Sequence, residues 1–282
     1  MVPAALTRGT KAVDDKQNEG VLLLPPSHGM WLALDVVPST GSTNADLLAR
    51  AADPDSPEGL VLVAEEQTAG RGRLGRSWSS VPGGSLTFSV LLRPAAVPAA
   101  RRGWLTLLAG VAVASAVRSV AGVDAMLKWP NDVLAGDRKL AGILAEQSPD
   151  GSAVVIGTGL NVAAAPGEIP VSATGLAATS LRAEGATASR ADLLLGVLTE
   201  LERWYVAFRA DPDPGRSGLL GAYRALCETL GRTVRVERPA GGALAGVARD
   251  VDAEGRLLVA DSLGGSVTPV SAGDVVHVRA PG

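Results

Sequence analysis

Cysteine, histidine and aromatic residues are scarce in this 282-residue chain, and each scarcity excludes a class of site. The single cysteine, Cys227, excludes an internal disulfide framework and a thiolate-rich zinc or iron–sulfur centre. The two histidines, His28 and His277, lie far apart in the chain, which disfavours a Ser-His-Asp hydrolase and a histidine metal cluster. Aromatic residues make up 3% and the formal net charge is −3, so a basic, base-stacking nucleic-acid module is disfavoured.

The remaining composition is that of a folded protein. Hydrophobic residues make up 46% and charged residues 20%, and a chain of this length buries roughly 70–75% of its unfolded surface. The longest weakly polar stretch, residues 103–117, falls short of the roughly 20 residues that a membrane helix needs, and we expect a buried helix. Asp14, Asp15 and Glu19 argue against a secretory signal. We therefore expect a soluble, cytoplasmic protein.

The hydrophobic pattern predicts two folded units after an N-terminal extension. Residues 1–30 have no periodicity and are expected to be poorly ordered. In residues 31–230, strands are predicted at 31–37, 60–64, 85–93, 126–129, 133–134, 140–146 and 153–156, and helices at 43–50, 104–120, 191–210 and 219–230. Residues 231–282 contain five short segments of strand character, which predict a small β-barrel. No internal repeat is present.

Residues 65–78 form the first segment that could carry chemistry. Their glycines allow backbone amides to approach a ligand, and their three arginines can bind phosphate or carboxylate with two donors each. Trp78, at the end of the segment, could stack on a base. A P-loop is excluded because no Gly-Lys-Ser/Thr follows. From composition alone, a solvated arginine-rich loop is an equally good interpretation.

Three further segments carry weaker signals. Lys128-Trp129-Pro130-Asn131-Asp132 could hold a phosphate and Mg²⁺, or form a plain turn. In residues 139–146, Lys139 opens an apolar strand, and Gly142 leaves room against the backbone. Read alone, however, such a lysine is more often an edge residue. Residues 157–162 place two glycines and Asn161 after a buried strand, a pattern typical of a bulge or turn.

The order of these segments is far more specific than any one of them. Gly-Ser-Thr-Asn at 41–44, the arginine-glycine segment, Lys-Trp-Pro-Asn-Asp, Lys-Leu-Ala-Gly-Ile-Leu at 139–144 and Gly-Thr-Gly-Leu-Asn at 157–161 together resemble the biotin protein ligases. The resemblance extends from about residue 31 to the C-terminus. It implies a mixed α/β catalytic domain with a largely antiparallel sheet, of the class II synthetase type, followed by an SH3-like barrel.

Such ligases convert biotin and ATP to biotinyl-5′-adenylate and pass biotin to a lysine of a biotin carboxyl carrier domain of an acyl-CoA carboxylase. The resemblance implies that ATP and biotin are substrates and that Mg²⁺ is required. It implies a carrier-domain partner, no DNA or membrane partner, and a monomer or weak homodimer. About 30 residues precede the first predicted strand, so we expect no DNA-binding helix-turn-helix.

The resemblance also assigns roles to residues of this chain. The catalytic residues it implies are Lys139, Arg71 and Lys128. Biotin contacts are implied for Ser42, Thr43, Asn44, Gln67, Arg71, Gly72, Arg73, Lys139 and Gly142. Contacts with ATP or the adenylate are implied for Arg73, Arg76, Trp78, Lys128, Asn131 and Asn161, with Trp78 stacked on adenine. A magnesium site is implied at Asn131, Asp132 and Asn161.

Three alternatives stay open. The related lipoate ligases share the reaction type, although the arginine-glycine segment favours biotin. A nucleic-acid module built from the arginine loop and barrel is disfavoured by the charge. A non-catalytic biotin-binding regulator would lose Lys128 or Lys139, and both are present.

Overall fold

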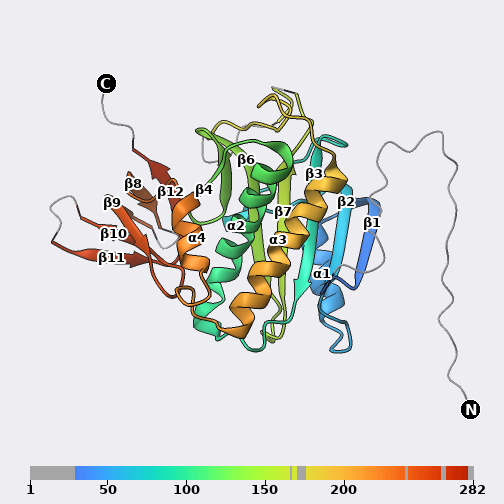
Figure 1. Cartoon of the computed structure of the whole chain (residues 1–282), viewed down its shortest axis with the longest axis horizontal. Coiled ribbons are helices and arrows are strands. Elements are labelled where there is room, and N and C mark those ends of the chain that lie inside the picture. Colours follow the sequence, from blue (N-terminus) through green and yellow to red (C-terminus); the bar gives the residue numbers. More distant parts are fainter. Residues whose placement is uncertain (1–28, 166, 170–175, 239–240, 262–264, 279–282) are drawn as a thin grey trace, which may run out of the picture.

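The computed structural model describes residues 29–165, 167–169, 176–238, 241–261 and 265–278, and it contains two β-sheets (Figure 1). The larger, seven-stranded sheet has the order β1 (Ala33–Thr40), β2 (Leu60–Gln67), β3 (Ser85–Leu92), β7 (Val154–Asn161), β6 (Arg138–Gln147), β5 (Asp132–Ala135) and β4 (Ala125–Lys128). Only β1 and β2 pair in parallel, and the other neighbours are antiparallel. The expected mixed, largely antiparallel sheet is confirmed. The expectation for residues 1–28 lies outside the described residues.

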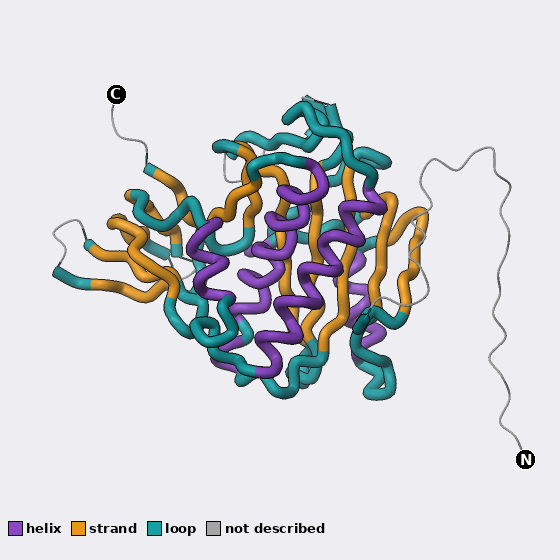
Figure 2. The backbone as a smooth tube through the Cα atoms, in the orientation of Figure 1, coloured by secondary structure: helices purple, strands orange, loops and turns teal. Residues whose placement is uncertain are grey.

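Helices cover both faces of this sheet (Figure 2). α2 (Gly103–Ala121) and α3 (Arg190–Ala210) lie side by side on one face, and α4 (Leu219–Leu226) packs against α2. α1 (Thr43–Ala51) lies on the other face. Alternation along the strands explains this division: Val61 and Val63 of β2 join the core under α2 and α3, whereas Leu62 packs under α1. The sheet therefore has two buried faces.

α2 is longer than the sequence predicted. Together with the short 3₁₀ turn before it (Ala99–Arg101), it forms a 23-residue helical segment, Ala99–Ala121, in which an 18-residue window has a mean hydropathy of 1.6, and by length and composition alone this segment could cross a membrane. The prediction that this stretch is too short for a span was therefore wrong. The prediction of a buried helix is confirmed, because 67% of the apolar window is buried and its side chains pack on the sheet and α3.

The smaller sheet is antiparallel and has the order β11 (Val267–Val270), β10 (Leu257–Ala260), β9 (Ala243–Val251), β8 (Thr233–Glu237) and β12 (Asp274–His277). In the described part of the chain, its edge strands β11 and β12 do not pair, so no closed barrel forms. The three residues between these edge strands span at most about 14 Å. The sheet must therefore curl strongly, as the predicted SH3-like unit requires.

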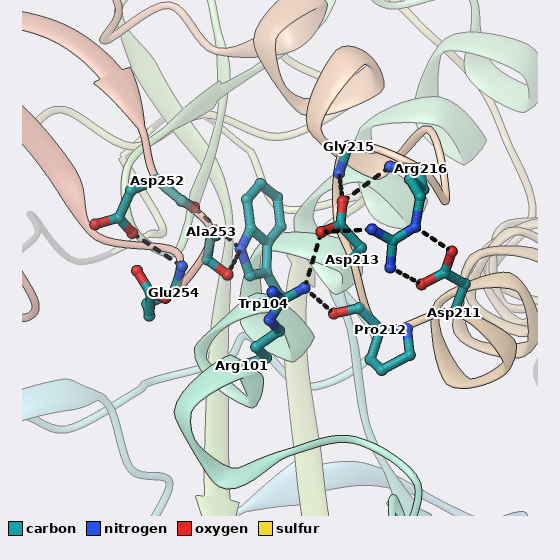
Figure 3. A network of polar contacts seen from close by, with 10 residues as sticks. All are labelled: Arg101, Trp104, Asp211, Pro212, Asp213, Gly215, Arg216, Asp252, Ala253 and Glu254. Atoms are coloured by element: carbon teal, nitrogen blue, oxygen red, sulfur yellow. Dashed lines mark hydrogen bonds and ion pairs between the residues drawn. The ribbon is translucent and has the colours of Figure 1, made fainter.

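The turn between β9 and β10 docks this sheet onto the start of α2 (Figure 3). The Trp104 indole N–H donates to the carbonyl oxygens of Asp252 (3.2 Å) and Ala253 (3.0 Å). The Trp129 indole N–H donates to the Gly255 carbonyl (3.1 Å). Both indoles are almost completely buried. These contacts fix the smaller sheet next to the Lys-Trp-Pro-Asn-Asp segment.

Candidate functional site

A cavity of about 470 Å³ lies on the α1 face of the larger sheet, beyond the N-terminus of that helix. α1 packs on Leu91 of β3 and Val155 of β7. Because side chains alternate between faces, the next positions on this face of β7 are Gly157 and Gly159, and β3 contributes Thr87. All three line the cavity. The volume suits a small-molecule ligand.

The structure brings every predicted site residue to this cavity. Its lining includes Ser42, Thr43, Asn44, Gln67, Arg71, Gly72, Arg73, Arg76, Trp78, Lys128, Asn131, Asp132, Lys139, Gly142 and Asn161. Lining residues to which the sequence assigned no role include Thr87, Phe88, Thr158, Asp274 and Val275. Asp274 and Val275 come from β12, so the smaller sheet forms part of the wall.

Three glycines on the floor of the cavity, Gly142, Gly157 and Gly159, leave space that side chains from other parts of the chain occupy. A Cβ on Gly157 would lie 2.2 Å from Asn44 Oδ1, and one on Gly159 would lie 2.2 Å from the Trp78 ring. A Cβ on Gly142 would lie 3.2 Å from the same ring. Residues 157–161 are regular strand rather than the predicted bulge or turn, and that prediction was wrong. Their glycines serve side-chain packing on a flat strand.

Trp78 therefore lies across the floor of the cavity. Its ring centroid is 5.8 Å from the Lys139 ammonium nitrogen, within reach of a cation–π contact. Its indole nitrogen is buried and has no hydrogen-bond partner in the described part of the chain. Stacking of Trp78 on adenine stays a prediction.

The arginine-glycine segment forms a small hairpin over the cavity. The Gly72 N–H donates to Arg76 O (2.7 Å), and the Trp78 N–H donates to Gly70 O (2.8 Å). Arg73 Nη1 donates to Asn131 Oδ1 at 3.2 Å, and Arg76 forms an ion pair with Asp274 of β12. The hairpin is thus tied both to the Lys-Trp-Pro-Asn-Asp turn and to the smaller sheet.

A shift in strand register places Lys139 in the cavity. Val133 of β5 pairs with Ala141, but Leu134 pairs with Lys139, so Leu140 is an extra residue on β6. Such a bulge re-aims side chains. Lys139 Nζ lies 2.6 Å from Asp132 Oδ1, and both side chains are at most 17% exposed. The bulge lies in the lysine strand, not in the glycine strand where the sequence suggested one.

The cavity has an excess of positive charge. Five basic side chains and two carboxylates line it. Burial lowers the pKa of Lys128 below its ordinary value, and the positive charges of Lys139 and Arg76 lower it further, against the opposing effect of Asp132. Lys128 Nζ is 4.0 Å from Asp132 Oδ2. Because cations in a desolvated site attract anions strongly, this end of the cavity suits a phosphate or carboxylate.

The predicted magnesium residues do not form a ready cage. The Asn131 amide donates to Ile143 O (2.9 Å), and the Asn161 amide donates to Thr179 O (3.0 Å). Asp132 is paired with lysine, and no cluster of three His, Cys, Asp or Glu suits a metal in the described part of the chain. One carboxylate still fits Mg²⁺ carried by a triphosphate, since that ion takes one or two protein carboxylates and completes its shell with phosphate oxygens and water.

His277 joins β12 to the Lys-Trp-Pro-Asn-Asp segment. Its Nε2 lies 3.1 Å from the Thr229 hydroxyl, which accepts a hydrogen bond from the Trp129 N–H (3.0 Å). Burial lowers the pKa of His277 from 6.5 to about 4, and Lys128 and Arg232 add to this effect. The folded protein therefore binds this proton less readily than the unfolded chain does.

The part of the free energy of unfolding that depends on a neutral His277 should consequently be fully present above about pH 6.5. It should be lost progressively as the pH falls from there towards about 4. We expect the free energy of unfolding, measured in urea at pH 7.5 and pH 5, to fall less in His277→Gln than in the unaltered protein. Comparing the two proteins removes the contribution of the carboxylates that both share. An equal fall in both proteins would contradict a neutral, buried His277.

Comparison with known proteins gives consistent matches. Residues 36–161 match the biotin/lipoate A/B protein ligase family, and residues 229–278 match the biotin protein ligase C-terminal domain. The chain is 47% identical to the biotin–[acetyl-CoA-carboxylase] ligase of Mycobacterium tuberculosis, over 88% of this chain and 90% of that protein. It is 34% identical to the bifunctional ligase/repressor BirA of Bacillus subtilis, over 80% of this chain and 67% of that protein.

Solved structures with the same fold include two ligand complexes. The biotin protein ligase of Aquifex aeolicus with biotin and ATP aligns with a TM-score of 0.73 and 29% identity, covering 88% of this chain and 99% of that chain. The biotin protein ligase of Leishmania major with biotinyl-5-AMP aligns with a TM-score of 0.59 and 26% identity, covering 85% and 98%.

Proposed function

The chain belongs to the biotin protein ligase family, and we propose that it activates biotin with ATP and attaches it to a lysine of a biotin carboxyl carrier protein. In the first step, a biotin carboxylate oxygen attacks the α-phosphorus of ATP, the bond to pyrophosphate breaks, and biotinyl-5′-adenylate forms. In the second step, a lysine amine of the carrier attacks the acyl carbon. That amine loses a proton and AMP leaves.

One observation carries this proposal: a single cavity combines a hydrogen-bonding end with a cationic end. Thr43 and Gln67 lie at the first end, where hydroxyl and amide groups suit a urea ring. Lys128 and Lys139 lie at the second, where two anionic reactants must meet. The like charge of carboxylate and phosphate opposes their reaction, and preorganised cations offset that repulsion.

The cations have separate tasks in this proposal. Lys139 contacts the biotin carboxylate and the α-phosphate, and it stabilises the charge that develops between them. Lys128 and Arg76 bind ATP phosphates. Arg71 and Arg73 lie on the hairpin over the cavity, which excludes water and so protects the adenylate from hydrolysis.

We propose that Mg²⁺ is bound together with ATP rather than at a preformed protein site. Asp132 is the carboxylate nearest to the two lysines, and it is the residue that can contact a metal carried by the triphosphate. Asn131 and Asn161 then orient the neighbouring strand ends, since each donates its amide to a backbone carbonyl.

The carrier domain of an acetyl-CoA carboxylase is the acceptor we propose, because the Mycobacterium tuberculosis relative is named for that reaction. We also propose a cytoplasmic location and a monomer or weak homodimer. The single cysteine, which is buried, leaves the chain without an internal disulfide, as is usual for proteins of a reducing compartment.

The decisive test is ATP–pyrophosphate exchange by the purified chain with Mg²⁺ and either biotin, lipoate or no acid. We expect exchange that depends on biotin, with at least about 100-fold preference over lipoate, because a site built to bind a urea rejects a ligand that leaves its polar groups unpaired. Exchange with lipoate alone would contradict the assignment of biotin as the substrate but would support adenylate formation as the reaction. Absence of exchange with either acid in a folded protein would contradict the proposed enzymatic activity.

A further inference from the structure

We propose that Ser89 and Glu146, which lie behind the cavity wall, fix which polar groups of the cavity donate hydrogen bonds and which accept them. The result is a hydroxyl at Thr43 that can only accept from a ligand, and hence a preference for a ligand that presents an N–H there. The inference rests on the proposed function, since a cyclic urea is the ligand it selects.

The hydrogen-bond order begins at Glu146. The Asn44 Nδ2 group lies 2.7 Å from Glu146 Oε2 and 3.1 Å from the Leu144 carbonyl oxygen. A carboxylate and a carbonyl oxygen can only accept, so the NH₂ group of Asn44 must face them. Arg71 lies 3.3 Å from the other Glu146 oxygen, which holds the carboxylate in place. The amide oxygen of Asn44 is therefore turned towards Ser89.

Ser89 transmits this order because a hydroxyl has one proton. The Ser89 hydroxyl, fully buried on β3, donates to Asn44 Oδ1 at 2.6 Å. Its oxygen is also 2.6 Å from Thr43 Oγ1, and a contact this short requires a proton between the two atoms. The Ser89 proton is already committed to Asn44, so the proton in this contact belongs to Thr43.

Thr43 then has only lone pairs to offer a ligand. Gln67 Oε1 lies 3.1 Å from Thr43 Oγ1 and accepts from the Thr43 backbone N–H (2.9 Å). The Thr43 hydroxyl could donate to either oxygen, but it has one proton, and that proton goes to the shorter contact with Ser89 (2.6 Å against 3.1 Å), so none remains for Gln67. Thr43 and Gln67 both line the cavity. A ligand N–H placed against this pair of acceptors satisfies both.

The amide orientation of Gln67 completes the pattern. Its oxygen faces the Thr43 N–H, so its NH₂ group points the other way and can donate to a carbonyl. The absence of a side chain at Gly70 makes room for it, since a Cβ there would lie 2.9 Å from Gln67 Nε2. Acceptors beside a donor match the N–H and C=O groups of a cyclic urea. The disulfide ring of lipoate offers neither group.

The test compares ligands that differ by one atom. Calorimetric dissociation constants are measured for biotin and for the two cyclic carbamates in which one or other ring N–H is replaced by oxygen. In the unaltered protein, we expect the isomer with oxygen against Thr43 to bind at least about 100-fold more weakly than biotin, because three acceptors then meet without a proton. In Ser89→Ala, the Thr43 hydroxyl can turn and donate, so this ratio should fall to about 10-fold or less.

Ser85→Ala is the matched control. Ser85 lies on the same strand, is 2% exposed, and its hydroxyl has no partner in the described part of the chain. Its ratio of dissociation constants should equal that of the unaltered protein. A purely structural role of Ser89 would weaken biotin and carbamate equally, and an unchanged ratio in Ser89→Ala would therefore overturn the inference.

Glu146→Gln gives a second measurement that does not depend on the folding of Ser89→Ala. A glutamine amide can present its oxygen to Asn44, and the Leu144 carbonyl still accepts from the same NH₂ group, so the ratio should stay within about twofold of that of the unaltered protein. A ratio that falls as far as in Ser89→Ala would show that the acceptors around Asn44 do not set the order, and it would overturn the inference. Failure of the proposed function would look different, since the unaltered protein would then neither bind biotin nor catalyse biotin-dependent exchange.

Discussion

Replacing Lys139 with alanine should lower biotin-dependent ATP–pyrophosphate exchange by about 10³-fold while the protein stays folded. Removal of one preorganised donor from a site of developing charge typically costs about 10²–10³ in rate. We expect the effect of Lys139 at the upper end of that range, because an ammonium group is a cationic donor and this one is mostly buried. Its side chain is 17% exposed and lies 2.6 Å from Asp132. The loss should appear in kcat more than in the KM for biotin, since the charge develops in the transition state.

The neighbouring basic residue provides the control. Arg138 precedes Lys139 on β6, but its side chain is 44% exposed and pairs with Glu184 outside the cavity. Arg138→Ala removes the same unit of charge and should leave exchange within about twofold, because an exposed charge is screened by solvent. Exchange by Lys139→Ala within tenfold of the unaltered protein would refute the assigned role.

Local sequence patterns predicted most of the fold and the residues that line the site. The strands of the larger sheet and the helices follow from hydrophobic periodicity, and Ser42 caps α1 as its residue type indicated. The arginine-glycine and Lys-Trp-Pro-Asn-Asp segments are contiguous, so their chemistry could be seen before the fold was known. Their roles came from the family resemblance rather than from the patterns themselves.

The supporting residues could not be predicted in the same way. Ser89 looks like one more polar residue in a buried strand, and it contacts Asn44, which lies 45 positions away in the chain. Asp274 reaches Arg76 across the junction of the two sheets. Such pairings depend on strand order and register, which local composition does not specify. The bulge at Leu140 could not be predicted either, because an extra residue in an apolar strand leaves no local sequence signal.

The hairpin over the cavity leads to the other large effect, which concerns retention of the intermediate. Arg73→Ala should release biotinyl-adenylate about 10- to 150-fold faster, because the mutation removes the contact between Arg73 and Asn131 that joins the hairpin to the Lys-Trp-Pro-Asn-Asp turn. A charge-assisted hydrogen bond contributes about 1.5–3 kcal/mol, which corresponds to about 10- to 150-fold. Exchange itself should fall less than tenfold, since Lys128 and Lys139 remain.

Two measurements separate release from synthesis. Loss of labelled adenylate from a gel-filtered complex gives the release rate, and biotin on lysines of added serum albumin reports the escaped acyl-adenylate. Leu74→Ala is the control, because Leu74 is in the same hairpin but is 51% exposed and does not line the cavity. It should retain the adenylate like the unaltered protein. If Arg73→Ala holds the adenylate as long as Leu74→Ala does, the hairpin is closed by other contacts, and the ion pair of Arg76 with Asp274 becomes the contact that retains the intermediate.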